Sequence, residues 1–173
     1  LPLRTTKQAE TSRLSRKAHG LEEARNLLED FGKQATELLL FLKSIAAIRV
    51  CRWTRERGLV DLFSARLKDD NKNLRSIPRH PGPRDYVVSI NEETWVVCNQ
   101  LGGGQASASA ESNPGLRLVP WAGVAARVDS ATQGRAYCFC PLPVRTGFGF
   151  HTNGFFEVSS NRRDIWQGDE DMT

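Results

Sequence analysis

The feature that most constrains the fold is a helical spacing of apolar residues in the first third of the chain. They recur at steps of three and four positions: Leu21, Ala24, Leu27, Leu28, Phe31, Ala35, Leu38, Leu42 and Ile45. This period is that of an amphipathic helix with a wide apolar stripe. Gly32 costs about 1 kcal/mol inside a helix relative to alanine. The sequence therefore allows one bent helix over 21–45 or two helices at about 21–31 and 34–45.

The residues that follow have the patterns of strands. Apolar and basic residues alternate strictly over 48–53, which indicates a half-buried strand. The segment 59–68 fits a strand or a helix, and the Pro- and Asn-rich segment 69–84 is a predicted loop. Segments 86–90 and 94–99 are predicted to pair as a hairpin with its turn at 91–93.

The second half of the chain adds further strand signals. The small and polar residues 102–115 predict a mobile loop, and 116–128 an edge or bulged strand because of Pro120 and Gly123. Residues 134–142 predict a buried strand. Asn153-Gly154 is the strongest turn signal of the chain, and 161–166 predicts a short helix start. Helices followed by hairpin-linked strands predict an α+β fold: an amphipathic helix or helix pair followed by a mixed, mostly antiparallel sheet.

Composition and charge exclude some classes of partner. The 24 basic and 20 acidic residues give a net charge of +4, but they are interspersed, so we expect no specific nucleic-acid binding. The longest apolar run, 38–42, is far too short to span a membrane. No signal-peptide pattern is present, and we expect a cytoplasmic protein.

The four cysteines are Cys51, Cys98, Cys138 and Cys140, and none forms a Cys-x-x-Cys pair. They are predicted to be small buried side chains of a reducing compartment, with metal or disulfide roles less favoured. The three histidines are far apart in sequence, so no metal site is predicted.

Motifs for catalysis are missing from the sequence. It has neither a Gly-x-Ser-x-Gly elbow nor paired histidines at helical spacing. The glycine run 102–104 lacks the lysine that a phosphate loop places after it, so it predicts a flexible loop. We expect this segment alone to bind no cofactor and to be no enzyme.

Two arginines are the best candidates for a functional site. Arg162 and Arg163 follow a predicted strand and open a predicted helix, where a guanidinium can reach an anion bidentately. The alternative, which the residues alone favour, is a structural pair with Asp164 or Asp169. Arg145 is expected in a surface turn.

Several runs of residues resemble one protein family. The runs 134–147 (GRAYCFCPLPVRTG) and 151–166 (HTNGFFEVSSNRRDIW) are similar to a hallmark of the sacsin family. The upstream runs 37–43 (ELLLFLK) and 116–125 (LRLVPWAGVA) agree in order, and 1–5 (LPLRT) resembles the strand that closes the preceding ATPase module.

The resemblance implies a place in a large chaperone-like protein. Sacsin-like repeats open with a GHKL-type ATPase module and continue into a region similar to the middle region of ninety-kilodalton heat-shock chaperones. By this resemblance, 1–20 is the end of the ATPase-like module with a connector, and 21–173 starts the middle-like region, helical over 21–45 and mainly strands over 48–158. ATP would be bound by the upstream module. Arg163-Asp164-Ile165 resembles the chaperones' Ser-Arg-Glu-Ile-like run, whose arginine reaches the terminal phosphate, with Arg162 as the alternate.

Two functions from different classes follow. The first is a segment of a sacsin-like chaperone or co-chaperone that couples the ATPase-like module to the rest of the repeat in protein folding or quality control. The second is a scaffold or client-binding module with no nucleotide role. The implied partners are other domains of the same large chain, chaperone machinery and client proteins.

Overall fold

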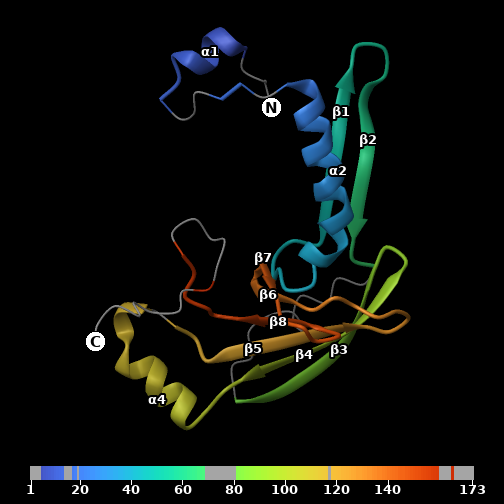
Figure 1. Cartoon of the computed structure of the whole chain (residues 1–173). Helices are drawn as coiled ribbons and strands as arrows, with labels where there is room; N and C mark the ends of the chain where they lie inside the picture. Colours follow the sequence, from blue (N-terminus) through green and yellow to red (C-terminus); the bar gives the residue numbers. More distant parts are fainter. Residues whose placement is uncertain are drawn as a thin grey trace. The chain divides into compact units, whose positions relative to one another are not determined.

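The computed structural model describes residues 5–13, 17–18, 20–68, 81–116, 118–159 and 165 (Figure 1). Contacts between residues divide the chain into two units, Leu1–Ala35 and Thr36–Thr173. A helix precedes two sheets of mostly antiparallel strands, so the predicted α+β class is confirmed. The predicted boundary between an ATPase-like module with its connector (1–20) and a middle-like region (21–173) concerns function, and it stays a prediction.

The first unit begins with a short helix that the sequence did not predict. Helix α1 is Thr6–Glu10, within the segment expected to be a connector. Thr5 and Gln8 form a reciprocal capping box at its start: the Thr5 Oγ1 accepts from the Gln8 N–H at 3.3 Å, and the Gln8 Oε1 accepts from the Thr5 N–H at 3.0 Å. These bonds satisfy backbone donors that a short helix would otherwise leave unpaired.

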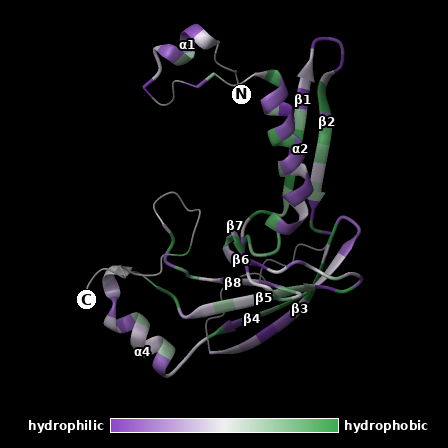
Figure 2. Cartoon of the chain, in the orientation of Figure 1, coloured by the Kyte–Doolittle hydropathy of each residue, from purple (hydrophilic) through white to green (hydrophobic). Residues whose placement is uncertain are grey.

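Helix α2, Leu21–Leu38, is the predicted amphipathic helix, and hydrophilic and hydrophobic residues alternate along it in Figure 2. It continues through Gly32 without a break, so of the two alternatives that the sequence allowed the single helix is the one observed. It ends at Leu38, before the predicted limit at 45. The next side chains, Leu39, Leu40 and Phe41, are all buried. Consecutive residues of a helix point about 100° apart, so a continued helix would direct these three side chains to different sides. A non-helical turn lets all three face the core.

The second unit contains a long two-stranded hairpin. Strands β1 (Ala47–Thr54) and β2 (Gly58–Arg66) pair antiparallel, with an irregular register between Val50 and Cys51. The segment that fitted a strand or a helix is therefore a strand. An isolated antiparallel bridge from Leu67 to Ile90 joins the end of this hairpin to the main sheet.

The main sheet has six strands in the order β3-β4-β5-β8-β6-β7. Its pairs are antiparallel except for the parallel pair β6–β8. The strand bounds are β3 Gly82–Ile90, β4 Glu93–Leu101, β5 Trp121–Arg127, β6 Arg135–Cys138, β7 Cys140–Arg145 and β8 His151–Gly154.

The predicted hairpin over 86–99 is confirmed as β3 and β4. Strand β3 begins at Gly82, so the loop predicted over 69–84 stops short of its expected end, and its residues 69–80 lie outside the described part. The mobile loop predicted over 102–115 is wrong, because helix α4 (Gln105–Ser112) and the 3-10 turn η1 (Pro114–Leu116) form there.

Three predictions about the later strands are also corrected. Strand β5 pairs with β4 on one side and β8 on the other, so it is no edge strand. Pro120 lies just before the strand and removes no hydrogen bond from within it. The single strand expected over 134–142 is two strands, separated at Phe139, whose φ of 61° turns the chain back on itself. Asn153-Gly154 lies within β8 instead of forming a turn.

One face of the six-stranded sheet is buried and the other is open. Strands β3, β4 and β5 alternate between the two faces, as expected for an antiparallel sheet covered on one side. The buried side chains include Tyr86, Val88, Ile90, Trp95, Val97, Trp121, Ala125 and Tyr137, together with Leu39, Leu40 and Phe41 from the turn after α2. Phe41 contacts Tyr137 with ring centroids 5.0 Å apart. This face also holds the polar side chains described next.

Candidate functional site

The two arginines predicted from the sequence, Arg162 and Arg163, lie outside the described residues. Of the predicted helix start at 161–166, only Ile165 is described, and it forms an isolated antiparallel bridge with Val158. At Ile165 the chain is therefore paired as a strand. The proposed contact of Arg163 with phosphate stays a prediction.

The glycine run 102–104 has the strand-to-helix setting of a phosphate loop, between β4 and α4. The structure supplies no lysine after it, because Gln105, Ala106 and Ser107 open the helix. The Ser107 hydroxyl donates to the carbonyl of Gly102 at 3.3 Å. This hydrogen bond closes the turn between β4 and α4 onto itself.

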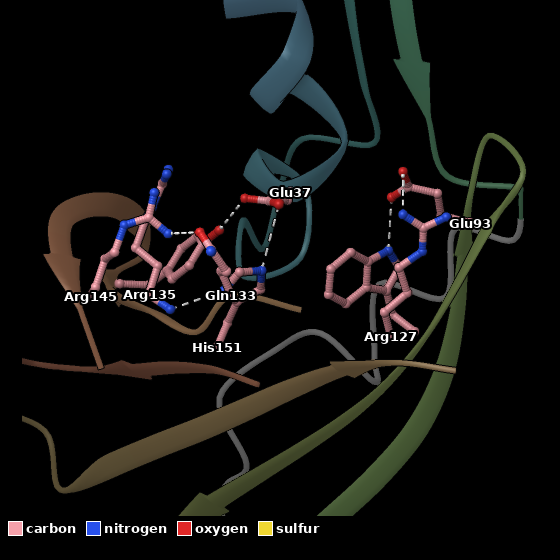
Figure 3. A network of polar contacts seen from close by, with 9 residues as sticks. Glu37, Glu93, Arg127, Gln133, Arg135, Arg145 and His151 are labelled. Carbon is pink, nitrogen blue, oxygen red and sulfur yellow. Dashed lines mark hydrogen bonds and ion pairs between the residues drawn. The ribbon is translucent and has the colours of Figure 1, made fainter. Parts of the chain in front are cut away.

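A largely buried polar cluster on the core face of the main sheet is the most developed site among the described residues (Figure 3). It consists of Glu37, Tyr137 and His151, here called the Glu37 cluster. Glu37 comes from the end of α2, Tyr137 from β6 and His151 from β8. The Tyr137 hydroxyl donates to Oε2 of Glu37 at 3.3 Å, and Nε2 of His151 lies 3.8 Å from the other carboxylate oxygen. Both ring side chains are at most 1% exposed.

The hydrogen bond of His151 with the backbone indicates which ring nitrogen carries the proton. Its Nδ1 accepts the backbone N–H of Arg135 at 3.2 Å, so Nδ1 carries no proton. The neutral ring therefore has its proton on Nε2, which faces the Glu37 carboxylate. At 3.8 Å this is an electrostatic contact and not a hydrogen bond. Two aromatic rings enclose the imidazole: Trp95 stacks on it at 5.4 Å and Tyr137 tilts against it at 5.1 Å.

Electrostatics favour an ionised Glu37 and a neutral Tyr137. The polar contact with His151 is the largest cause that lowers the pKa of the Glu37 carboxyl, and it outweighs the partial burial, which acts in the opposite direction. The charge of Arg135 lowers the same pKa. Burial strongly raises the pKa of the Tyr137 phenol, and the negative charge of Glu37 raises it further.

A second polar network lies at the β4–β5 pair. Glu93 accepts from the Trp95 indole N–H at 3.2 Å and from the Arg127 guanidinium at 3.1 Å. Arg127 also donates to Asp129 at 2.8 Å, and this bond is the largest cause that lowers the pKa of that carboxyl. Figure 3 shows Glu93 and Arg127 beside the Glu37 cluster, and Arg145 bonded to Gln133. Arg145 ends strand β7, so the predicted surface turn begins one residue later.

Two buried asparagines flank a glycine in the same row of the sheet. Asn99 on β4 and Asn153 on β8 are both register partners of Gly123 on β5. The Asn99 amide donates to the Tyr86 hydroxyl at 3.2 Å, and Oδ1 of Asn153 accepts the Phe139 N–H at 2.8 Å. The second bond satisfies the backbone where the chain turns between β6 and β7. Gly123 is needed between them because a Cβ there would collide with the Asn99 Oδ1.

The Glu37 cluster joins distant parts of the chain through polar contacts. Its tyrosine stays protonated, its carboxylate is ionised, and its imidazole is engaged by a backbone N–H. Nowhere in the described ranges do three or more His, Cys, Asp or Glu side chains gather as a metal site. The arrangement is that of an anchor, which holds the end of α2 against β6 and β8.

The sequence contained a weak signal for this site. His151 and Asn153 stand two positions apart, which places both on one face of a strand. A turn was predicted at Asn153-Gly154, so His151 and Asn153 were not expected on one strand. Glu37 was expected to lie within a helix that continues to residue 45.

The expectation that the cysteines are buried is wrong. Cys140 is exposed, and Cys51, Cys98 and Cys138 are partly exposed, all as free thiols. Cys138 and Cys140 are register partners across the turn at Phe139. Hydrogen bonding to Asp85 is the largest cause that raises the pKa of Cys98, and bonding to Asp61 does the same for Cys51.

Comparisons with known proteins give one strong similarity. Human sacsin is 29% identical over 200 aligned residues, which cover 97% of this chain and 4% of sacsin. The chain thus spans a small part of the length of this relative. No family model and no solved structure matches the chain. Within the described residues, every helix is too short or too polar to cross a membrane. Over nearly its whole length, this chain is a sacsin-like region.

Proposed function

We propose that this chain is a chaperone-related segment that couples an ATPase-like module to the rest of a sacsin-like protein. The observation that carries the proposal is the similarity to human sacsin over 97% of the chain. The resemblance of the individual runs adds the GHKL-type module before it and the middle-like region within it. ATP would bind to that module, and the partners would be neighbouring domains, chaperone machinery and client proteins in the cytoplasm.

The physical basis of the coupling is an arginine that a second domain delivers to a nucleotide. A guanidinium placed on a transferred phosphoryl group stabilises the charge of the transition state. Arg163 is the proposed residue because Arg163-Asp164-Ile165 resembles the phosphate-contacting run of the ninety-kilodalton chaperones, and Arg162 is the alternate.

An anchored helix supports this proposal. Helix α2 includes residues of both units and is continuous through Gly32. Its last turn is held by the buried contacts of Glu37 with Tyr137 and His151. A helix fixed in this way transmits a displacement of its end better than a flexible linker does.

The test uses the parent protein, including its ATPase-like module. Arg163→Ala should slow ATP hydrolysis and leave nucleotide affinity nearly unchanged, because the contact strengthens mainly in the transition state. Arg163→Lys should rescue little, since an ammonium lacks the bidentate fork. Arg162→Ala is the matched control, with a smaller expected effect.

Two outcomes distinguish the alternative, a scaffold or client-binding module without a nucleotide role. If the parent module does not bind ATP, the coupling proposal fails and the scaffold function replaces it. If Arg163→Ala lowers the melting temperature but leaves hydrolysis unchanged, the arginine is a structural partner of a carboxylate such as Asp164.

A further inference from the structure

The β1–β2 hairpin ends in an exposed apolar pair. Trp53 and Leu59 are directly opposed register partners, next to the turn at 55–57. Side chains directly opposite each other in an antiparallel pair lie on the same face. Trp53 is 69% exposed and Leu59 66% exposed. A tryptophan and a leucine side by side in solvent are unfavourable unless a partner covers them.

Three arginines lie close to this pair in sequence and form no ion pair within the described part of the chain. They are Arg52, the neighbour of Trp53, and Arg55 and Arg57 in the turn, and all three are exposed. Within the described part of the chain, no carboxylate lies within ion-pair distance of these guanidinium groups. Further down the same hairpin, Arg49 is paired with Asp61 at 2.6 Å. Arg52, Arg55 and Arg57 thus lie together near the turn of the hairpin, where Glu56 is the one acidic residue of 52–60.

The turn itself is held in one geometry. The Thr54 hydroxyl accepts the Arg57 N–H at 3.2 Å and donates to the Gly58 carbonyl at 3.4 Å. Gly58 has a φ of 66°, which a glycine adopts without strain. A binding surface that is already ordered loses little conformational entropy on binding. Figure 2 shows this turn as hydrophilic and the following start of β2 as hydrophobic.

We propose that this hairpin tip, formed by Arg52, Trp53, Arg55, Arg57 and Leu59, binds an acidic segment of a partner protein that carries apolar side chains among its carboxylates. Trp53 and Leu59 supply the apolar contact, and tryptophan is enriched among the residues that dominate protein interfaces. The guanidinium groups pair with carboxylates bidentately. The proposal does not depend on the coupling role, because the tip involves neither nucleotide nor Arg163.

Nucleic acid and an anionic membrane surface fit the tip less well than an acidic protein segment does. A nucleic acid would stack its bases on aromatic faces, but Leu59 offers no such face and Glu56 repels phosphate. An anionic membrane requires a larger apolar anchor than two side chains for stable binding. A protein interface can depend on a single well-placed tryptophan.

The test measures the binding of the full chain to a short fluorescein-labelled peptide of glutamate, leucine and phenylalanine, by fluorescence anisotropy. Trp53→Ala should weaken binding on the order of tenfold or more, as for a truncated hot-spot residue. The double variant Arg55→Glu/Arg57→Glu should also weaken binding and reduce its dependence on salt. Both changes are at exposed positions, and thermal melting of each variant checks that the fold is intact.

Matched controls separate the tip from the rest of the surface. Val87→Ala removes another exposed apolar side chain, 65% exposed on β3, and Arg25→Glu reverses an exposed charge on α2. Neither should change the affinity. A peptide with glutamine in place of glutamate should bind more weakly than the acidic one.

Three results would overturn the proposal. The first is equal binding by wild type and Trp53→Ala, and the second is equal affinity for the glutamine peptide. The third is tighter binding to oligouridine or phosphatidylserine vesicles than to the acidic peptide, lost in Trp53→Ala, which would assign the tip to RNA or to a membrane surface.

Discussion

The Tyr137 hydroxyl donates a hydrogen bond to Oε2 of Glu37 at 3.3 Å and thereby joins two residues 100 positions apart. The same carboxylate faces Nε2 of the buried His151. One acidic side chain at the end of a helix therefore makes a hydrogen bond to one strand of the sheet and an electrostatic contact to another.

Glu37→Gln should lower the free energy of unfolding at neutral pH by about 1 kcal/mol, because glutamine keeps an acceptor for Tyr137 but loses the charge that faces His151. The folded-state pKa of Glu37 lies below its ordinary value of 4.5. The stability that ionised Glu37 contributes is therefore present above about pH 4.5 and is lost as pH falls through the lower folded-state pKa.

Urea unfolding of wild type and Glu37→Gln between neutral and acidic pH checks this expectation. The difference between the two proteins should shrink as pH falls below 4.5. Glu29→Gln, an exposed position on the same helix, is the control and should show little effect at any pH. A difference that persists undiminished at low pH would mean that the charge of Glu37 does not stabilise the fold.

Tyr137→Phe should remove one source of alkaline denaturation. The folded-state pKa of Tyr137 lies above its ordinary value of 10.0, mainly because the phenol is buried. Above pH 10 the unfolded chain loses this proton while the folded chain retains it, so wild-type stability falls as pH rises. The variant should be less stable at neutral pH by about 1 kcal/mol, from the lost hydrogen bond, but its stability should fall less steeply above pH 10. Parallel alkaline profiles in denaturant titrations would contradict the assignment.

Gly123→Ala should destabilise the protein by about 1–3 kcal/mol, the usual range for overpacking a core. The new methyl group would meet the Asn99 Oδ1 and lie 3.4 Å from the Phe41 ring. Gly149→Ala is the control, because a Cβ at Gly149 meets nothing within 4 Å. Thermal melting of the two variants measures the loss of stability in each. The double variant Gly123→Ala/Asn99→Ala should lose less than the sum of the single changes; strict additivity would show that the two residues do not share this space.

Alkylation by iodoacetamide at mildly alkaline pH should modify Cys140 before Cys98. Cys140 is exposed, whereas Cys98 is partly buried and the hydrogen bond with Asp85 raises its pKa, which reduces the reactive thiolate. Peptide mapping by mass spectrometry gives the order. Asp85→Asn removes the carboxylate charge and should speed the reaction of Cys98 while leaving Cys140 unchanged. Equal rates for the two thiols in wild type would refute this.

The spacing of apolar residues predicted the elements in which one face is buried and the other is exposed along the whole length. The three- and four-residue spacing predicted α2, and period-two alternation predicted β1 and the β3–β4 hairpin. In these segments each side chain faces the core or solvent according to the period of its own element. The family resemblance also followed from sequence alone, because runs of specific residues carry it.

The failed predictions lie where distant contacts outweigh local preference. Asn153-Gly154 is a strong turn signal, but pairing with β5 on one side and β6 on the other makes it a strand. Pro120 and Gly123 suggested an edge, but Pro120 lies before β5, and Gly123 makes room for Asn99.

The α+β class, the amphipathic helix, the alternating strands and the similarity to sacsin all follow from the amino-acid sequence alone. Tertiary structure decided where α2 ends, how β8 enters between β5 and β6, and that Glu37, Tyr137 and His151 meet. The physical reason is that periodicity records only which face of an element is apolar. A buried polar group has no periodic signature, and its partner can come from any part of the chain whose hydrogen bonds satisfy it.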